Sequence, residues 1–365
     1  MSSPGSHSGS LSTWTWVAPV AAALFLGLLA VGVLSVGSVW VIVLAALLLA
    51  GSVFASVQHA EMVALRVGEP FGSIILAASV TVIEVSLIVS LMLSSPEGGT
   101  EIARDTVFSA VMIVLNGVVG LCLLVGGIRH HQQEFQIRGA VGSLGVIGTL
   151  ATLALILPNY TLSVPGPIFS QAQLVFVGVV SLALYGLFLF VQTVRHREDF
   201  LDAEGSHGAH AKPDGRTTLL SGGLLLLSLV TVVLLAEDLS HPVEEGIASL
   251  GLPLSFVGVV IAAVVLLPEG LSAIAAARAN RLQTSLNLAL GSAMASIGLT
   301  IPTVVAVSLF MGTPLSLGLD PEHIVILVLT LFMCTLSFGA GRTTVLQGGV
   351  HLVIFGAFLV IAAVP

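Results

Sequence analysis

The sequence predicts an all-α membrane protein that crosses the bilayer about eleven times, as one extra helix followed by two inverted repeats of five helices. The 365 residues are 56% hydrophobic and only 8% charged, whereas soluble domains are about 25% charged. Apolar runs of membrane-spanning length recur along the whole chain. Two of these runs also share a pattern, because each has a single glutamate near its middle.

The spans are predicted as runs of roughly 17 to 25 apolar residues bounded by turn-forming or charged residues. They cover residues 14–33, 37–57, 71–94, 105–128, 138–157, 171–194, 217–236, 253–275, 284–311, 321–338 and 345–364. The polar stretch between the sixth and seventh spans is predicted to be a flexible cytoplasmic linker. Its histidines, which could instead bind a metal, are His196, His207 and His210.

Span one stands outside the repeated pattern, so the chain divides into five parts. These are a disordered tail at 1–13, an extra helix at 14–33, a first five-helix repeat at 37–194, the linker at 195–216 and a second repeat at 217–365. The tail lacks the basic start and cleavage site of a secretory signal. Because five is an odd number, the second repeat must enter the bilayer with the opposite orientation, as in many secondary transporters.

The basic residues indicate the orientation. If the N-terminus is cytoplasmic, all Lys and Arg residues except Arg104 lie on cytoplasmic connections, which is the bias of the positive-inside rule. The outer connections are instead acidic, with Glu97, Glu101, Asp105, Glu237, Asp238, Glu244, Glu245, Asp320 and Glu322. An acidic outer face raises the local concentration of cations, although ordinary solvated loops explain these acids equally well.

Two glutamates occupy corresponding positions in two apolar runs. Glu84 lies in FGSIILAASVTVIEVSLIVSLM and Glu269 in FVGVVIAAVVLLPEGLSAIAAA, each at the same distance from the first residue of its run. Ionisable side chains inside the bilayer are costly to bury and mark functional sites. Substrates of inverted-repeat transporters bind near the midplane where the repeats meet. We therefore expect Glu84 and Glu269 to form a common site there.

Polar residues follow each acidic run at near-helical spacing, namely Ser109, Asn116 and Gly120 in one span and Ser292, Ser296 and Thr300 in the other. We take Asn116, Ser292 and Ser296 as candidate cation ligands, although small residues of this kind also serve only to pack helices closely. Pro268 removes a backbone donor directly before Glu269. The carbonyl freed in this way either coordinates an ion or simply accompanies a kink.

Further acids are expected at the mouths of the pathway, where they would admit cations or relay protons. These are Glu61, Glu237, Glu244 and Glu245. Glu61 precedes Gly68 by the same interval that separates Glu244 from Gly251, so the duplication includes these positions. A solvated acid at a helix end is the alternative interpretation of each.

Two carboxylates with amide, hydroxyl and carbonyl oxygens suit a hard cation such as Ca²⁺, which binds about six to eight oxygens. We expect no sulfur or imidazole at the midplane, which disfavours zinc and copper. Two ionised glutamates neutralise one Ca²⁺, and in its absence they are expected to hold protons. Ca²⁺ and protons would then compete for the same oxygens, as an exchanger requires.

Two stretches resemble the alpha repeats of the cation/Ca²⁺ exchanger superfamily, and they are most similar to the bacterial calcium/proton antiporters. They are AEMVALRVGEPFGSIILAASVTVIEVSLI and LPEGLSAIAAARANRLQTSLNLALGSAMASIGLTIP. The resemblance implies an antiporter of the bacterial inner membrane, driven by the proton gradient, with its repeat acids at Glu84 and Glu269. It also implies polar ligands at Asn116, Ser292 and Ser296.

The chain departs from the related vacuolar exchangers shortly before each acid. Their Gly-Asn pairs are replaced here by Val80 and Thr81, and by Val265 and Leu266. This difference leaves room for Na⁺ or K⁺ beside Ca²⁺ as the cation exchanged for H⁺. The aspartates of a multi-sodium site are not evident beside either glutamate, which favours protons as the counter-ion.

Two other classes of function are compatible with intramembrane acids. A passive cation channel, or a transporter of another substrate, would use the same acids without obligatory exchange. An intramembrane enzyme would need a nucleophile or metal-binding histidines at depth, and the candidate there, His351, is isolated and is expected to be a packed residue. Cys122 and Cys334 lie in apolar runs and are expected to be buried thiols. We expect no cofactor and no nucleic-acid partner.

Overall fold

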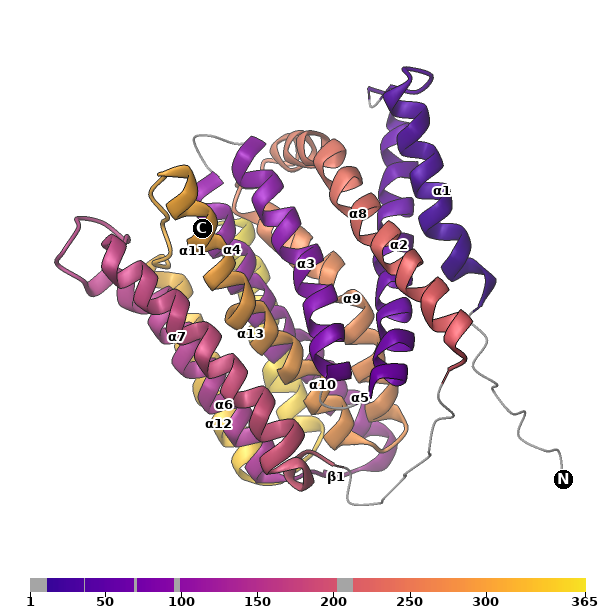
Figure 1. The fold of residues 1–365 in the computed structure, drawn as a ribbon. Coiled ribbons are helices and arrows are strands. Elements are labelled where there is room, and N and C mark those ends of the chain that lie inside the picture. Colours follow the sequence, from indigo (N-terminus) through magenta and orange to yellow (C-terminus); the bar gives the residue numbers. More distant parts are fainter. Residues whose placement is uncertain (1–11, 36, 69–70, 95–98, 202–212) are drawn as a thin grey trace, which may run out of the picture. The chain divides into compact units, whose positions relative to one another are not determined.

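The structure is a computed structural model that describes residues 12–35, 37–68, 71–94, 99–201 and 213–365. The described part is almost entirely helical (Figure 1). It contains ten helical segments long and apolar enough to cross a membrane, together with a shorter apolar stretch at Ile75–Ser90. The predicted fold class of about eleven spans is therefore confirmed. Residues 1–11 of the predicted tail, together with Glu97, His207 and His210, lie outside the described residues.

Most helices begin and end close to the predicted boundaries, but Val39–Val67 and Gly215–Ser249 continue 10 and 13 residues past the predicted ends at 57 and 236. The α-helices are α1 (Thr13–Ala30), α2 (Val39–Val67), α3 (Phe71–Ser94), α4 (Gly99–Met112), α5 (Val119–His130), α6 (Ile137–Ala151), α7 (Gln171–Phe190), α8 (Gly215–Ser249), α9 (Phe256–Arg278), α10 (Leu282–Ala295), α11 (Ile301–Met311), α12 (Pro321–Gly339) and α13 (Val345–Ala363). Short 3₁₀ or π segments are η1 (Ile113–Val118), η2 (Thr152–Ile156), η3 (Leu157–Tyr160), η4 (Val191–Arg195), η5 (Arg197–Phe200) and η6 (Ser296–Thr300). Two-residue strands β1 (Gln133–Glu134) and β2 (Arg342–Thr343) pair antiparallel.

The acidic segments predicted as outer loops are mostly helical, which corrects that prediction. Helix α8 continues to Ser249 through Pro242 and carries Glu237, Asp238, Glu244 and Glu245. Glu101 and Asp105 likewise belong to α4. A helix of 35 residues is about 52 Å long, well beyond the roughly 30 Å hydrocarbon core. Hydropathy marks the part of a helix that lies in lipid, so it misses a polar extension of this kind.

The chain forms two compact units, and the boundary between them falls within α3 and α8. The first comprises residues 1–83 and 207–239. In it, α1 packs along α2 (Figure 1), and Gly51 lets the helices approach because its Cβ position lies only 3.4 Å from Ala18. The buried His59 Nε2 lies 3.0 Å from the Thr15 carbonyl oxygen. The extra helix is thus held to α2 by packing and a buried polar contact.

The second unit comprises residues 84–206 and 240–365, and in it the helices of the two repeats interleave. Helix α4 packs against α9, α5 against α13, α6 against α12 and α7 against α11 (Figure 1). Glycines permit these approaches, because a Cβ on Gly258 would lie 2.8 Å from the Thr106 backbone nitrogen. A Cβ on Gly348 would likewise lie 2.9 Å from the Gly120 carbonyl oxygen. Small residues at such crossings are the usual means of packing helices in membranes.

Each repeat contains a π-helical segment at the same place. Helices α4 and α10 both have 14 residues, and they continue directly into η1 and η6 respectively. A π-helical turn is rare and occurs frequently at functional sites. Both segments lie in the middle of their spans, which run over Glu101–His130 and Leu282–Met311. The duplication read from the sequence therefore extends to a local distortion of the backbone.

Candidate cation site

The Glu84 carboxyl lies on α3 within the second unit and is 2% exposed. Its Oε2 accepts a hydrogen bond of 2.8 Å from the Ser296 hydroxyl, at the start of η6. This bond joins an acid of the first repeat to a polar residue of the second. Glu84 and Ser296 were both predicted as site residues, and the structure brings them together.

A second hydroxyl lies on the same face of η6. Thr300, four residues after Ser296, places its hydroxyl beside the Glu84 carboxyl, and this buried oxygen has no hydrogen-bond partner among the described residues. Glu84 Oε1 is likewise buried without a hydrogen-bond partner there. Buried polar groups ordinarily have partners. The carboxylate and hydroxyl oxygens here are the kinds of ligand that hard cations prefer.

The second predicted acid, Glu269, lies on α9 and is half-buried. Its neighbours in sequence, Pro268 and Gly270, are both buried. The space beside Gly270 is closed by η1, since a Cβ at Gly270 would lie 3.2 Å from Val118 Cγ2. The π-helical segment of the first repeat therefore packs against the turn of α9 that carries the second acid.

Asn116 lies in η1 and is fully buried, with both ends of its amide engaged. Its Nδ2 donates to Thr330 Oγ1 at 2.9 Å, and its Oδ1 lies 3.2 Å from His351 Nδ1. Met112 Sδ is 3.8 Å from the same Nδ2. The expectation of no imidazole or sulfur at this depth was therefore wrong. His351 is not isolated either, since its Nε2 lies 3.1 Å from Ser337 Oγ.

The remaining predicted residues occupy less enclosed positions. Ser292 is half-buried on α10, one helical turn before Ser296. Glu61, Glu237 and Glu245 are exposed on their helices, and Glu244 is half-buried. Glu245 Oε1 lies 3.9 Å from His241 Nε2. Cys122 and Cys334 are free and buried, as predicted.

A buried ion-pair cluster surrounds Arg104, and sequence reasoning missed it. Arg104 Nε lies 2.8 Å from Asp105 Oδ1, Nη2 lies 3.5 Å from Asp320 Oδ2, and Nη1 donates to the Gly318 carbonyl oxygen at 3.1 Å. Arg104 was the one basic residue placed outside by the predicted topology, and that exception was the available signal. The cluster links α4 to the segment before α12. Asp320 also belongs to a group with Glu322 and His323 whose ligand atoms lie close together, and a cation there would compete with the Arg104 guanidinium for Asp320.

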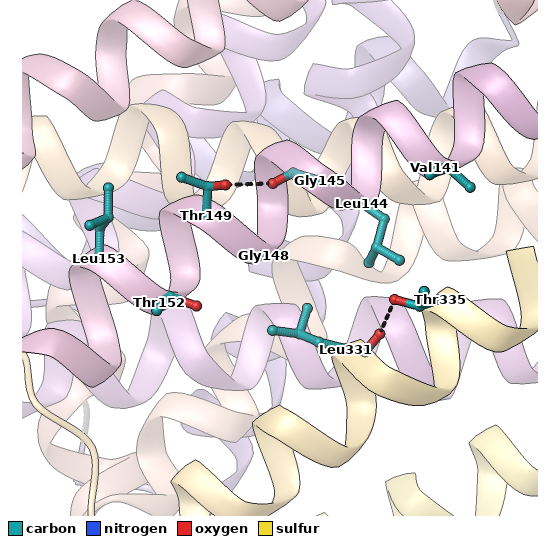
Figure 2. A pocket seen from close by; sticks show the side chains of 9 residues that line it. All are labelled: Val141, Leu144, Gly145, Gly148, Thr149, Thr152, Leu153, Leu331 and Thr335. Atoms are coloured by element: carbon teal, nitrogen blue, oxygen red, sulfur yellow. Dashed lines mark hydrogen bonds between the residues drawn. The ribbon is translucent and has the colours of Figure 1, made fainter. Parts of the chain in front are cut away.

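The groove in Figure 2 lies between α6 and α12, away from the candidate ligands, and has a cavity volume of about 530 Å³. Its Thr149 and Thr335 hydroxyls donate within their own helices, to the carbonyl oxygens of Gly145 and Leu331 (Figure 2). No titratable side chain lines it. An apolar surface groove of this kind does not suit a metal ion.

The sequence matches the sodium/calcium exchanger protein family over residues 37–194 and 220–364. It is 53% identical to the y4hA protein of Sinorhizobium fredii over 362 residues, which cover 98% of both chains. It is 36% identical to the sodium-potassium/proton antiporter ChaA of Escherichia coli over 313 residues, which cover 84% of each chain.

The fold also matches a solved structure. The structure of native YfkE superposes with a TM-score of 0.73 and covers 96% of this chain and 100% of its own. At 17% sequence identity, this likeness shows a shared arrangement of helices.

Proposed function

Because the chain belongs to the sodium/calcium exchanger protein family, we propose that it is an antiporter that exchanges a metal cation for protons across a membrane. Glu84 and Glu269 are the groups that hold either the cation or protons. Ser292, Ser296 and Asn116 are the proposed polar residues around them. The cation and the protons are cargo, so the protein needs no cofactor and catalyses no covalent reaction.

The observation that best supports this proposal is the buried Glu84 carboxyl with its hydroxyl partner from the other repeat. A buried carboxylate without compensation is strongly unfavourable, so it must bind a cation or a proton. The Ser296 bond leaves Oε1 without a hydrogen-bond partner among the described residues. One carboxyl can therefore keep its orienting bond while the other oxygen takes a cation or a proton.

Ca²⁺ is the first candidate cation, since two glutamates neutralise its charge and hydroxyl oxygens are suitable ligands. Na⁺ or K⁺ is the second candidate. It is favoured by the name of the Escherichia coli relative and by the residues one turn before the acids. Thr81 donates its hydroxyl to the Ala77 carbonyl oxygen of its own helix at 2.9 Å, and Leu266 is apolar.

We place the protein in the bacterial inner membrane with its N-terminus in the cytoplasm, because this orientation puts nearly all Lys and Arg residues on the cytoplasmic side. Protons moving down their gradient then drive cations out of the cell. Glu61, Glu237, Glu244 and Glu245 are proposed to admit cations or relay protons at the mouths of the pathway.

Proton-coupled flux in everted vesicles tests the proposal. After respiration establishes a proton gradient, Ca²⁺, Na⁺ and K⁺ are added separately across a range of pH, and recovery of a pH-sensitive dye is followed. At least one cation is expected to collapse the gradient in a saturable manner, whereas vesicles without the protein do not respond. Cation flux that proceeds without counter-movement of protons would instead identify a passive channel.

A further inference from the structure

A buried chain of hydrogen bonds connects η1 to α12 and α13. It runs from Ser337 through His351 and Asn116 to Thr330, and all four side chains are 2% exposed or less. Thr330 Oγ1 in turn lies 3.6 Å from Met112 Sδ. Such a chain is costly when any member lacks a partner, because the desolvation of each polar group must be compensated.

The donors in this chain follow one direction. Asn116 uses its Nδ2 as donor to Thr330, so its Oδ1 accepts from Nδ1–H of His351. In a neutral imidazole, Nε2 then has no proton and accepts from the Ser337 hydroxyl. This is the tautomer of neutral His351 that satisfies every member of the chain.

His351 contacts η1 through the side chain of Asn116, whose Oδ1 lies 3.2 Å from His351 Nδ1. It also lies close to the backbone just after η1. Gly120 makes this approach possible, because a Cβ there would lie 3.1 Å from His351 Cβ. A π-helical turn is less favourable than an α-helical one and persists where surrounding contacts stabilise it. His351 supplies such contacts from α13.

The end of η1 packs against the turn of α9 that carries Glu269. Val118, the last residue of η1, packs against Gly270 on α9. If η1 returned to α-helical geometry, residues beyond it would rotate by about 100° for each residue of register lost. Val118 would then leave its position beside Gly270. The geometry around Glu269 thus depends on the contacts that Asn116 of η1 makes with His351 and Thr330.

We propose that His351 is a positioning residue that keeps η1 π-helical through its hydrogen bond with Asn116, and thereby sets the affinity for the transported cation at Glu269. This proposal rests on the proposed antiport function. His351 touches neither glutamate in this account and acts only through η1.

Two substitutions of His351 distinguish the roles of its two ring nitrogens. His351→Asn keeps an amide nitrogen at the place of Nδ1, facing Asn116, and loses the contact with Ser337. His351→Gln keeps one at the place of Nε2, facing Ser337, and loses the contact with η1. Ser337→Ala removes the far end of the chain and is the matched control. For each variant, the half-saturating cation concentration and the maximal rate of proton-coupled flux are measured in proteoliposomes with equal amounts of protein.

We expect His351→Gln to raise the half-saturating concentration about tenfold with less than a twofold change in maximal rate. His351→Asn and Ser337→Ala are expected to stay within about twofold of the wild type in both. Cation-dependent thermal stabilisation of the detergent-solubilised protein should shift in parallel, as a readout independent of transport. A purely structural role would lower the maximal rate or the yield of folded protein and leave half-saturation unchanged.

Wild-type half-saturation in His351→Gln, or an equal increase in His351→Asn, overturns the proposal. If His351→Gln does not fold, the same measurement on Thr330→Val tests the proposal. Valine has nearly the shape of threonine but lacks the hydroxyl that accepts from Asn116 Nδ2. A threefold or greater rise in half-saturating concentration supports the proposal, and a smaller change refutes it. Failure of the antiport function itself would appear separately, as absence of proton-coupled flux in the wild type.

Discussion

Ser296 Oγ lies 2.8 Å from Glu84 Oε2, so a hydroxyl at the start of a π-helical segment of the second repeat orients the buried acid of the first. The two residues are 212 positions apart in the chain. Their contact gives the duplication a functional meaning, because it makes one site out of two repeats. Thr300, four residues after Ser296, provides a second hydroxyl beside the Glu84 carboxyl.

Removal of the Ser296 hydroxyl should weaken cation binding. Ser296→Ala leaves Glu84 Oε2 without its donor, and a hydrogen bond to a charged group contributes about 1.5–3 kcal/mol. We expect a rise of about tenfold or more in the half-saturating cation concentration of proton-coupled flux. Thr335→Ala is the control, because the Thr335 hydroxyl donates only within its own helix. Equal behaviour of the two variants would contradict a role for Ser296 in the site.

Arg104 should be required for stability. Arg104→Met leaves Asp105, which is 5% exposed, as a buried acid without its cation, and breaking a buried pair costs about 3–5 kcal/mol. The melting temperature of the detergent-solubilised protein should fall markedly. Asp320→Asn removes a partner whose side chain is 52% exposed and should cost less than about 1 kcal/mol. A larger loss from Asp320→Asn than from Arg104→Met would show that the cluster is held differently.

The crossing of α4 and α9 should not tolerate a side chain. Gly258→Ala would place a Cβ 2.8 Å from the Thr106 nitrogen and 2.9 Å from the Asp105 carbonyl carbon. Both are backbone atoms that cannot rotate away, so a loss of about 1–3 kcal/mol is expected. Gly349→Ala, where nothing lies within 4 Å, should leave the melting temperature unchanged or raise it. Tolerance of Gly258→Ala would mean that the helices pack less closely.

Cysteine labelling can test the proposed orientation without removal of the native thiols, since Cys122 and Cys334 are buried. Glu198 and Leu162 are exposed and fall on opposite sides of the proposed topology. A membrane-impermeant maleimide applied to intact spheroplasts should label Leu162→Cys and not Glu198→Cys. Everted vesicles should show the reverse. Labelling of Glu198→Cys from outside would invert the orientation.

The positions of the spans could be predicted from sequence because lipid exposure requires long apolar runs. The run that predicted a helix at 71–94 corresponds to α3 (Phe71–Ser94). Gly68 follows Glu61 at the same interval at which Gly251 follows Glu244, and this repetition has a physical basis. Both glycines have positive φ angles, of 80° and 72°. Only glycine adopts that conformation readily at the end of a helix. Repetition in the sequence therefore reflected repetition in the backbone.

The environment of His351 could not be predicted in the same way. Its partners Asn116 and Ser337 lie on other elements, and a single histidine in an apolar run gives no local signal of a hydrogen-bonded chain. The π-helical segments could not be predicted either. A π-helical turn adds a single residue to an α-helix, and in an apolar run this leaves no visible change in the hydrophobic periodicity. The ion pairs of Arg104 depend on the approach of α4 to Asp320, which only tertiary structure determines.

The most direct test of the central claim is proton-coupled cation flux in proteoliposomes containing wild type, Glu84→Gln or Glu269→Gln, compared at equal amounts of folded protein. Each substitution keeps the size of the side chain and removes the group proposed to alternate between cation and proton. We predict that either change abolishes exchange while the melting temperature stays close to that of the wild type. Saturable cation/proton exchange that survives in both variants would contradict the account.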